Sequence, residues 1–169
     1  MTKIIRPIRI DGNIAYVPLT KGYEAIIDAT DVPLVDAWNW TTLVARSNVY
    51  GFRNYWKDKI KRRVYLHRAI MGEPDGFQVD HINRNGLDNR RVNLRLATRS
   101  QNQHNRIASF NNTSGFKGVT WHNGAKKWQA QIAFFGKHKY LGRYDTVEDA
   151  HAAYVEASIK YHGEFRRVQ

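Results

Sequence analysis

The feature that most constrains the fold of this chain is a polar stretch between residues 80 and 102. Its first two residues, Asp80 and His81, follow the short β-prone run Phe77–Val79, and a loop rich in Asn, Asp and Gly comes next. The run Val92–Leu96 then returns as a second β-prone segment. We therefore expect two paired strands joined by a tight polar loop.

A short helix is predicted directly after the second strand. Thr98 is followed three residues later by Gln101, which is the pattern of a capping box, so the helix should start at Arg99. Asn102 then lies in or just past its first turn and can face the strand pair. The expected unit is two strands, a polar loop and a helix, with a metal ion between helix and strands.

The residue types in this unit suit phosphodiester hydrolysis. Asp80 supplies a charged oxygen and Asn102 a neutral one, and a chain without cysteine and with few histidines favours Mg²⁺, or secondarily Mn²⁺, over Zn²⁺. His81 has the intrinsic pKa to deprotonate water near neutral pH. Asn93 either fixes the loop or orients His81 through a hydrogen bond. An isolated Asp-His pair is most often a surface dipeptide, so the order of the surrounding residues carries this interpretation.

That order resembles the HNH (ββα-metal) nuclease family, especially its homing-endonuclease branch, from Leu66 to Arg106. The matching residues are His67-Arg68, Val79-Asp80-His81, Asn83, Asn85, Leu87-Asp88-Asn89, Asn93-Leu94-Arg95 and Ser100-Gln101-Asn102. The resemblance implies a nuclease that leaves 5′-phosphate and 3′-hydroxyl ends.

The resemblance also implies roles for single residues. Asp80 and Asn102 would ligate the metal, His81 would be the general base, and Asn93 would be the middle, orienting residue. Many relatives carry His at the third motif position, where this chain has Asn102, and His104 is a nearby substitute. His67 is expected to be structural or a substrate contact rather than a ligand.

The charge of the chain predicts a polyanionic partner. Lys and Arg number 27 against 15 Asp and Glu, which gives a formal net charge of +12 and a pI of about 10.1. Membrane surfaces attract the same charge, but no basic amphipathic helix stands out. The absence of cysteine excludes disulfides and thiolate zinc sites. No signal peptide or bilayer-spanning run is recognisable, so the cytoplasm of a bacterial or phage-infected cell is expected.

Basic residues are densest just before the nuclease-like segment. The cluster comprises Arg46, Arg53, Lys57, Lys59, Lys61, Arg62, Arg63 and Arg68, with Asp58 as the one acidic residue between them. We expect Arg62, Arg63 and Arg68 to contact DNA phosphates, which positions a duplex without reading its sequence. An exposed, solvated basic loop is the alternative.

Residues 1–64 read as a β-rich N-terminal region of short strands broken by turn residues. Within it, Asp31 is predicted as the N-cap of a short helix with Pro33 in the first turn. Trp38 and Trp40 are expected to be core residues.

The C-terminal segment predicts a three-stranded sheet packed on one helix. Residues 109–113 form a linker, and strand-like runs cover Phe116–Trp121, Lys127–Phe135 and Lys139–Tyr144. A helix should begin after Thr146, whose hydroxyl caps it, and end at Gly163. In the middle strand the set starting at Trp128 should pack inward and the set starting at Gln129 outward.

The outward face of this sheet is the candidate DNA-reading surface. It would display Lys117, Thr120, His122, Gln129, Gln131, His138 and Tyr140. Amide side chains can pair with adenine edges, and strands can enter the major groove. A merely solvated sheet face is the alternative.

The segment from Ser114 to Glu164 resembles the plant ethylene-response-factor (Apetala-two) DNA-binding domain. Its matching residues are Phe116-Lys117-Gly118-Val119, Lys127-Trp128-Gln129-Ala130-Gln131-Ile132, Tyr140-Leu141-Gly142-Arg143-Tyr144-Asp145-Thr146, Glu148-Asp149-Ala150, Ala152-Ala153-Tyr154 and Tyr161-His162-Gly163. The resemblance places DNA contacts on most of the outward residues and on Ala133. Relatives carry Arg at several such positions, where this chain has Thr120 and Ala133, so the target sequence stays open.

The chain is thus expected to be an α+β protein with a β-rich region at 1–64, a ββα-metal unit at 65–108, a linker and a DNA-binding domain at 114–169. Its expected partner is double-stranded DNA, with a divalent metal as cofactor. A monomer should nick and a homodimer could break both strands. The alternatives are a sequence-specific DNA-binding regulator that does not cut, and a structural nucleic-acid or RNA binder.

Overall fold

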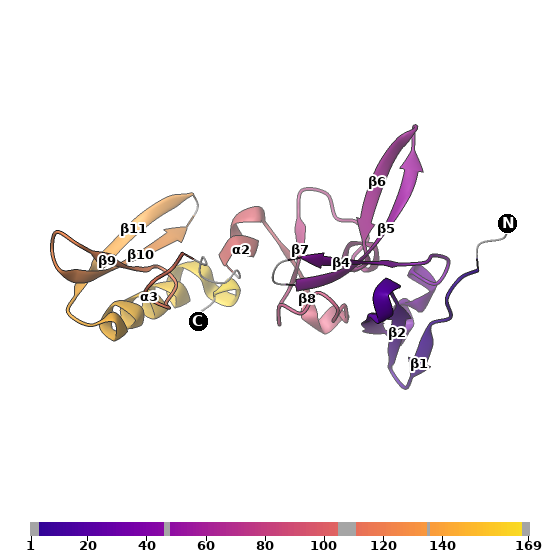
Figure 1. The fold of residues 1–169 in the computed structure, drawn as a ribbon, viewed down its shortest axis with the longest axis horizontal. Coiled ribbons are helices and arrows are strands. Elements are labelled where there is room, and N and C mark those ends of the chain that lie inside the picture. The colour runs from indigo at the N-terminus through magenta and orange to yellow at the C-terminus, as the bar shows by residue number, and fades with distance from the viewer. Residues whose placement is uncertain (1–3, 46–47, 105–110, 135, 167–169) are drawn as a thin grey trace. The chain divides into compact units, whose positions relative to one another are not determined.

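The computed structural model describes residues 4–45, 48–104, 111–134 and 136–166, except for the side chains of Gln103 and His104. The predictions made for Arg46, for the His104 side chain and for Phe135 therefore lie outside the described residues. The chain divides into two compact units, residues 1–97 and 98–169, each of which is described by itself (Figure 1). Both units contain strands and helices, which confirms the α+β class.

The first unit contains two three-stranded antiparallel sheets, each in sequence order. Their strands are β1 (Arg9–Asp11), β2 (Ile14–Pro18) and β3 (Glu24–Asp28), then β4 (Thr41–Ala45), β5 (Asn48–Lys57) and β6 (Ile60–Tyr65). The long β5–β6 hairpin rises away from the rest of the unit (Figure 1). Its tip turns through Asp58 and Lys59, which both have positive φ, as a type I′ hairpin turn requires.

Short helical segments lie between successive strands of this unit. They are the 3₁₀ turns Thr20–Gly22, Ala29–Leu34 and Arg91–Asn93, and helix α1 (Leu66–Ile70). Asp31 lies inside the second 3₁₀ turn, whose N-cap is Asp28, so the prediction of Asp31 as N-cap is wrong. The Asp31 carboxylate is instead buried against the guanidinium of Arg91, with Oδ1 2.8 Å from Nη2.

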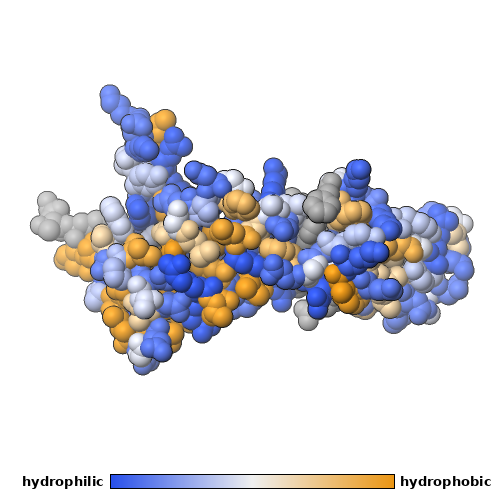
Figure 2. Space-filling model, turned by 180° about the vertical axis from the view of Figure 1, so that it is seen from behind, coloured by the Kyte–Doolittle hydropathy of each residue, from blue (hydrophilic) through white to orange (hydrophobic). Residues whose placement is uncertain are grey.

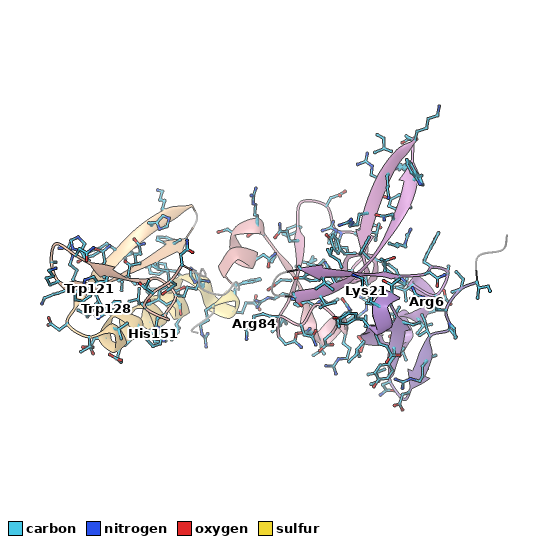
Figure 3. The ribbon with its side chains drawn as sticks, in the orientation of Figure 1. Arg6, Lys21, Arg84, Trp121, Trp128 and His151 are labelled. Atoms are coloured by element: carbon cyan, nitrogen blue, oxygen red, sulfur yellow. The ribbon has the colours of Figure 1, made fainter. Side chains whose placement is uncertain are left out.

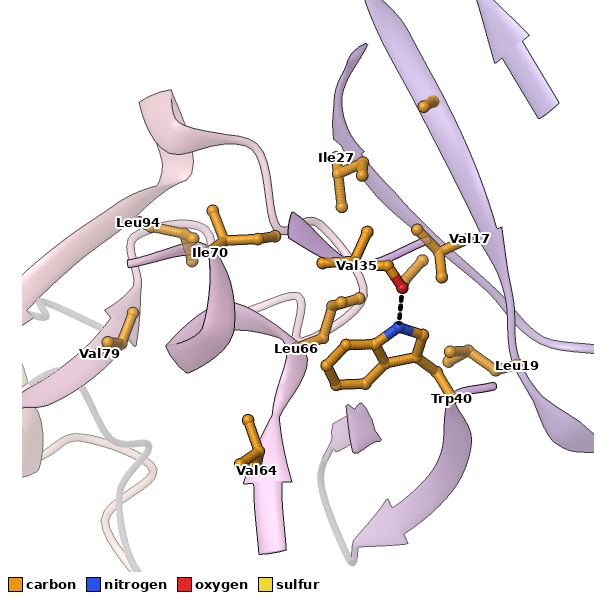
Figure 4. Close-up of a cluster of buried hydrophobic side chains, with 12 residues drawn as sticks. Val17, Leu19, Ile27, Val35, Trp40, Val64, Leu66, Ile70, Val79 and Leu94 are labelled. Carbon is orange, nitrogen blue, oxygen red and sulfur yellow. Dashed lines mark hydrogen bonds between the residues drawn. The ribbon is translucent and has the colours of Figure 1, made fainter. Parts of the chain in front are cut away.

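One hydrophobic core joins the N-terminal sheets to the strands that carry the nuclease-like motif. Those strands, β7 (Gln78–His81) and β8 (Leu94–Ala97), form a two-stranded antiparallel ribbon. Val79 and Leu94 from this ribbon belong to the same buried cluster as Trp40, whose Nε1 donates to the Val35 carbonyl oxygen at 3.0 Å (Figure 4). Trp40 is a core residue as predicted, whereas Trp38 is 45% exposed.

The second unit is a three-stranded antiparallel sheet packed on one long helix, as expected. Its elements are α2 (Arg99–His104), β9 (Val119–His122), β10 (Lys127–Phe134), β11 (Lys137–Tyr144), α3 (Val147–His162) and the 3₁₀ turn Gly163–Phe165. Ala130 and Ile132 from the middle strand are buried against α3, which confirms the predicted inward set.

Both predicted helix caps in this unit form. The Thr98 Oγ1 accepts from the Gln101 backbone N–H at 3.2 Å, while Gln101 Oε1 accepts from the Thr98 N–H at 2.8 Å. Thr146 caps α3 by accepting from the Asp149 N–H at 3.1 Å. Among the described residues, no helix combines the length and apolar character that crossing a membrane requires.

Candidate active site and nucleic-acid interface

Asp80 lies in the β7–β8 ribbon directly opposite Arg95. Its Oδ2 accepts from Nε and Nη2 of Arg95 at 2.9 and 2.8 Å, and both side chains are largely buried. A buried carboxylate is stable only when it is paired or bound to a cation, and here the guanidinium is the paired cation. Strand residues alternate in direction, so Asp80 contacts Arg95 while its neighbour His81 has different partners.

His81 is 5% exposed, and its ring is oriented by Asn89. Its Nε2 lies 3.1 Å from Oδ1 of Asn89. The Asn89 Nδ2 donates to the carbonyl oxygens of Leu87, at 3.1 Å, and Gly86, at 3.5 Å, which identifies the other amide atom as the acceptor. Because Oδ1 can only accept, a neutral His81 ring carries its proton on Nε2 and its lone pair on Nδ1.

Aromatic rings enclose the His81 imidazole. Its centroid lies 6.0 Å from that of Tyr50 and 4.9 Å from that of His67, the latter edge-to-face. Burial lowers the pKa of His81 below its ordinary value, against smaller raising effects from Asn89, Asp80 and Asp88. The ring is therefore neutral near pH 7, which is the state that a general base requires.

His67 is held still more firmly in the neutral state. Its ring stacks on Tyr65 at 5.4 Å, and its buried Nδ1 has no hydrogen-bond partner. Burial, followed by the charges of His81 and Arg68, lowers the pKa of His67 to about 3. The prediction that His67 is structural or a substrate contact stays a prediction.

Asn93 fixes the loop between β7 and β8. Its Oδ1 accepts from the Asn83 backbone N–H at 2.8 Å, and its Nδ2 donates to the Asn83 Oδ1 at 2.9 Å and to the Asp88 carbonyl oxygen at 2.7 Å. The side chain of Asp88 is paired with Arg90 at 2.7 Å, which lowers the pKa of that carboxyl group. The orienting contact on His81 comes from Asn89, which the sequence analysis had not selected.

The same loop is attached to the N-terminal sheet. The Ile26 backbone N–H donates to the Leu87 carbonyl oxygen, and the Asn89 N–H donates to the Ile26 carbonyl oxygen, both at 2.7 Å. Arg91 adds its contacts to Asp31 and donates its backbone N–H to Asp28 Oδ2 at 2.7 Å. The edge strand β3 therefore holds the residue that orients His81.

Gly86 allows the loop to approach β5 closely. A Cβ at this position would lie 2.4 Å from the Val49 carbonyl oxygen and 2.5 Å from the Tyr50 ring, closer than carbon atoms can approach. Asn48 completes the contact, since its Oδ1 accepts from the Gly86 N–H at 2.9 Å. The loop, Tyr50 and the His81 ring thus form one packed group.

Asn102 lies on α2, in the second unit. Its assignment as a metal ligand stays a prediction, as do the predicted domain limits. Within the described residues there is no group of three or more His, Cys, Asp or Glu side chains that could hold a metal. One carboxylate and one amide are a smaller donor set, of the kind that suits Mg²⁺, which keeps several water or phosphate ligands.

The three arginines predicted to contact DNA differ in their surroundings. Arg62 and Arg63 are exposed on β6 of the projecting hairpin. Arg68 instead donates to the carbonyl oxygens of Phe77 and Pro74, both at 2.9 Å, and so fixes the loop before β7. Its DNA-contact role stays a prediction, but the described contacts are structural.

The sheet of the second unit presents the predicted polar face. Gln129 is paired directly with Thr120 on one side and with Arg143 on the other, and His122 lies 3.1 Å from Arg143 Nη2. The predicted outward face did not include Arg143, because strict alternation of side chains along the strand from Tyr140 would point Arg143 inward. A β-bulge at Leu141 inserts one extra residue, so the inward and outward alternation of side chains shifts by one position after it.

Gly142 makes that bulge possible. Its φ of +140° is a backbone conformation that side-chain-bearing residues rarely adopt, and a Cβ there would meet the Tyr144 ring at 2.9–3.1 Å. A glycine inside a β-prone run is the sequence signal that could have predicted the bulge. Arg143 therefore joins the outward face.

A cavity lies between this end of the sheet and helix α3, since Tyr154 and His162 also line it. Gln131 is paired with Tyr140, and Ala133 with His138. Lys117, Gln131 and His138 line the cavity, whose volume is about 360 Å³. At the other end of the sheet, Trp121 and Trp128 pack edge-to-face with centroids 5.1 Å apart (Figure 3).

Comparison with known proteins finds a family model for part of the chain and viral relatives over most of it. A family model described as HNH endonuclease matches residues 64–104. Protein 3.8 of Escherichia phage T7 is 32% identical over 118 residues, which cover 69% of this chain and 96% of that protein. An uncharacterized HNH endonuclease, L560 of Acanthamoeba polyphaga mimivirus, is 29% identical over 86% of this chain and 74% of its own length.

The C-terminal segment has relatives of a different kind. The ethylene-responsive transcription factor WRI1 of Arabidopsis thaliana is 44% identical over 52 residues, or 30% of this chain and 12% of that protein. The APETALA2-like protein 2 of Oryza sativa is 39% identical over 51 residues. No solved structure matches the chain. With its HNH motif built on a paired-strand ribbon and its relatives among viral proteins, the chain belongs to the HNH endonuclease family and carries an APETALA2-like segment at its C-terminal end.

Proposed function

We propose that the protein is a metal-dependent DNA endonuclease that uses His81 as its general base. The observation that carries this proposal is the buried His81 ring, whose Nε2 lies 3.1 Å from the amide oxygen of Asn89. In the tautomer that this contact favours, Nε2 carries the proton and Nδ1 carries the basic lone pair.

In the proposed reaction, His81 Nδ1 removes a proton from a water molecule while the oxygen of that water forms a bond to phosphorus. The bond from phosphorus to the 3′-oxygen breaks, and that oxygen takes a proton from solvent water, which leaves 5′-phosphate and 3′-hydroxyl ends. Asp80 and Asn102 would hold the metal, most simply Mg²⁺ and alternatively Mn²⁺. A metal there would stabilise negative charge on the phosphate and on the leaving oxygen.

Asp80 fits this role because its carboxylate is a hard oxygen donor that is already desolvated. The Arg95 guanidinium neutralises it in the absence of a metal. The guanidinium thus supplies the opposite charge that a buried carboxylate needs when no metal is bound.

The C-terminal sheet is proposed to hold the duplex near the site. The contacts are assigned to the outward face, which comprises Lys117, Thr120, His122, Gln129, Gln131, His138, Tyr140 and, in addition, Arg143. Tethering two weak DNA-binding units raises the local concentration of each, so neither needs high affinity alone.

Supercoiled plasmid incubated with the protein and Mg²⁺ tests the proposal. The wild type should convert it to the nicked form, with end-labelling showing 5′-phosphates. His81→Ala should abolish nicking and leave the gel shift of a labelled duplex unchanged. A His81→Ala variant that still nicks would refute the assignment of the base. Linear product that appears together with nicked product would indicate that two copies act on one site.

A second candidate function is a sequence-specific DNA-binding regulator that does not cut. The similarity of the C-terminal segment to plant transcription factors favours it. It predicts a selective gel shift that survives competitor DNA, with no cleavage of any tested DNA in Mg²⁺ or Mn²⁺. Selection from randomised duplexes, followed by a cleavage assay on the selected sequences, separates the two functions.

A further inference from the structure

We propose that one face of the β5–β6 hairpin is a track for duplex DNA that leads to His81. This face, called here the track face, comprises Asn54, Trp56, Lys61, Arg63 and Tyr65, together with Phe52, which is buried against Arg63. The inference deepens the proposed nuclease function and rests on it. It assigns a DNA contact to Arg63 and not to Arg62, although the sequence alone predicts the same role for both.

The strand register defines the track face. Phe52 is paired directly with Tyr65, and Trp56 with Lys61, so the side chains of each pair project from the same side of the hairpin. The Arg63 guanidinium lies 4.3 Å from the centroid of the Phe52 ring. That contact holds the arginine on the track face and limits its freedom before DNA binds.

At its base the track face is continuous with the candidate active site. Tyr65 stacks on His67 at 5.4 Å, and the ring of Tyr50, on the same side of β5, lies 6.2 Å from Tyr65. Tyr50 is also 6.0 Å from the His81 ring. An unbroken series of side chains therefore runs from the hairpin to the proposed base.

The opposite face of the hairpin is occupied at its base by the core. Val64 is buried there, and a Cβ at Gly51 would contact Leu19 and Leu66 at 3.2–3.4 Å. Arg53 stays on that side, with its guanidinium 4.1 Å from the Trp38 ring. The opposite face is exposed to solvent only near the tip of the hairpin. DNA bound to that face could therefore not extend along it to His81.

Charge and shape identify the occupant as duplex DNA. The hairpin from Asn48 to Tyr65 carries six Lys and Arg residues against one Asp. Figure 2 shows the projecting hairpin as largely hydrophilic, yet Trp56 near its tip is 70% exposed. A two-stranded β-ribbon has the width of the major groove, and an exposed aromatic ring on a basic ribbon suits contact with sugars and bases.

The length of the track also matches DNA. From Tyr65 to Lys61 the strand rises about 13 Å at about 3.3 Å per residue. That distance spans about four base-pair steps of a duplex at about 3.4 Å each. Lys61 and Arg63 would thus contact phosphates a few nucleotides from the scissile bond.

Two charge-matched double variants of the full-length chain test the direction of the track. Lys61→Gln with Arg63→Gln removes two charges from the track face, and Lys57→Gln with Arg62→Gln removes two from the opposite face. Binding of a mixed-sequence duplex is measured as a function of salt. The first variant should lower the slope of log affinity against log salt by about 1.8, the value for two lost phosphate contacts. The second should leave the slope close to that of wild type.

Trp56→Ala and Ile60→Ala form a second matched pair, because both side chains are apolar and exposed near the tip. Trp56→Ala should weaken duplex binding about fivefold or more, as truncation of a central interface aromatic does, and Ile60→Ala should have little effect. Circular dichroism and thermal melting check that each variant stays folded. Equal losses in both members of either pair would overturn the track.

The chain contains no cysteine, which allows a direct measurement of proximity. Asn54→Cys on the track face and Arg62→Cys on the opposite face are mixed with thiol-tethered duplexes. Disulfide cross-linking should occur at position 54 and not at 62, and the reverse result would refute the inference. If the face preference holds but the wild type never nicks DNA, the track stands and the nuclease function fails. If the wild type nicks DNA but neither face of the hairpin is preferred, the nuclease function stands and the track fails.

Discussion

Oδ1 of Asn89 lies 3.1 Å from Nε2 of His81, and Asn89 itself is completely buried. The contact joins the proposed base to a loop that the N-terminal sheet holds in place through Ile26. We therefore regard Asn89 as a positioning residue that acts through His81.

Substitution of Asn89 should affect both His81 and the loop, because the Asn89 Nδ2 also donates to the Leu87 and Gly86 carbonyl oxygens. Asn89→Asp keeps an acceptor oxygen and adds negative charge, so it should retain nicking and raise the pKa of His81. Asn89→Leu removes the acceptor, and the expected loss of nicking is about 10- to 100-fold. Nitrogen-15 NMR of the imidazoles should find the His81 proton on Nε2 in the wild type. A loss of that tautomer preference in Asn89→Leu would support the role, and an unchanged spectrum would contradict it.

Arg95 is expected to compete with a metal for Asp80. Arg95→Gln leaves a buried carboxylate without its guanidinium, so the variant should be less stable by about 1–3 kcal/mol in the absence of metal. Mg²⁺ should restore part of this loss, because a ligand that binds only the folded state stabilises it.

Thermal melting with Mg²⁺ and with EDTA measures the effect. The rise in Tm on adding Mg²⁺ should be larger for Arg95→Gln than for the wild type and should vanish in an Asp80→Asn background. A rise of equal size in all three proteins would place the metal elsewhere.

His67 should make the protein acid-sensitive. Its pKa is about 3 in the folded state against 6.5 in an unfolded chain, so between these values the unfolded state binds more protons. Stability should therefore fall as the pH decreases through this window, by several kcal/mol at most. His81, whose pKa is also lowered, adds to the same trend.

Urea unfolding at a series of pH values checks this prediction. His67→Phe, which keeps an aromatic ring against Tyr65, should flatten the dependence of unfolding free energy on pH. Replacing the exposed His138 by Gln provides a control that should leave the dependence as it is. A His67→Phe protein with the wild-type pH profile would show that His67 titrates normally.

Gly86→Ala should destabilise the first unit by about 1–3 kcal/mol, since the new methyl group overlaps the backbone of Val49 and the ring of Tyr50. Gly124→Ala is the matched control, because a Cβ there meets nothing closer than 3.4 Å. Chemical denaturation should show the difference, and nicking by Gly86→Ala should fall with it, because Tyr50 also contacts His81. Equal stability of both variants would contradict the close approach.

Local patterns predicted much of this structure. The capping pairs at Thr98 and Thr146 and the alternation around Ala130 depend on residues a few positions apart, and all three formed as expected. The HNH motif likewise placed Asp80 and His81 at the end of a strand. Such features need no knowledge of distant segments.

Contacts between distant residues could not be predicted in the same way. Arg91 reaches Asp31 across 60 positions, and this ion pair explains why Asp31 is not a helix cap. Within the loop, several asparagines are equally eligible to orient His81, and only the folded backbone selects Asn89. At Arg143 a single bulge reversed the expected direction of the side chain.

The backbone pairing of Ile26 with Leu87 and Asn89 has a consequence for dissecting the molecule. The family model that matches residues 64–104 includes neither β3 nor Tyr50. A polypeptide excised at those limits would lose the β3 backbone that pairs with the loop. It would also lose the Tyr50 ring that packs beside His81. Grafting this catalytic motif onto another protein would therefore require the preceding strands to travel with it.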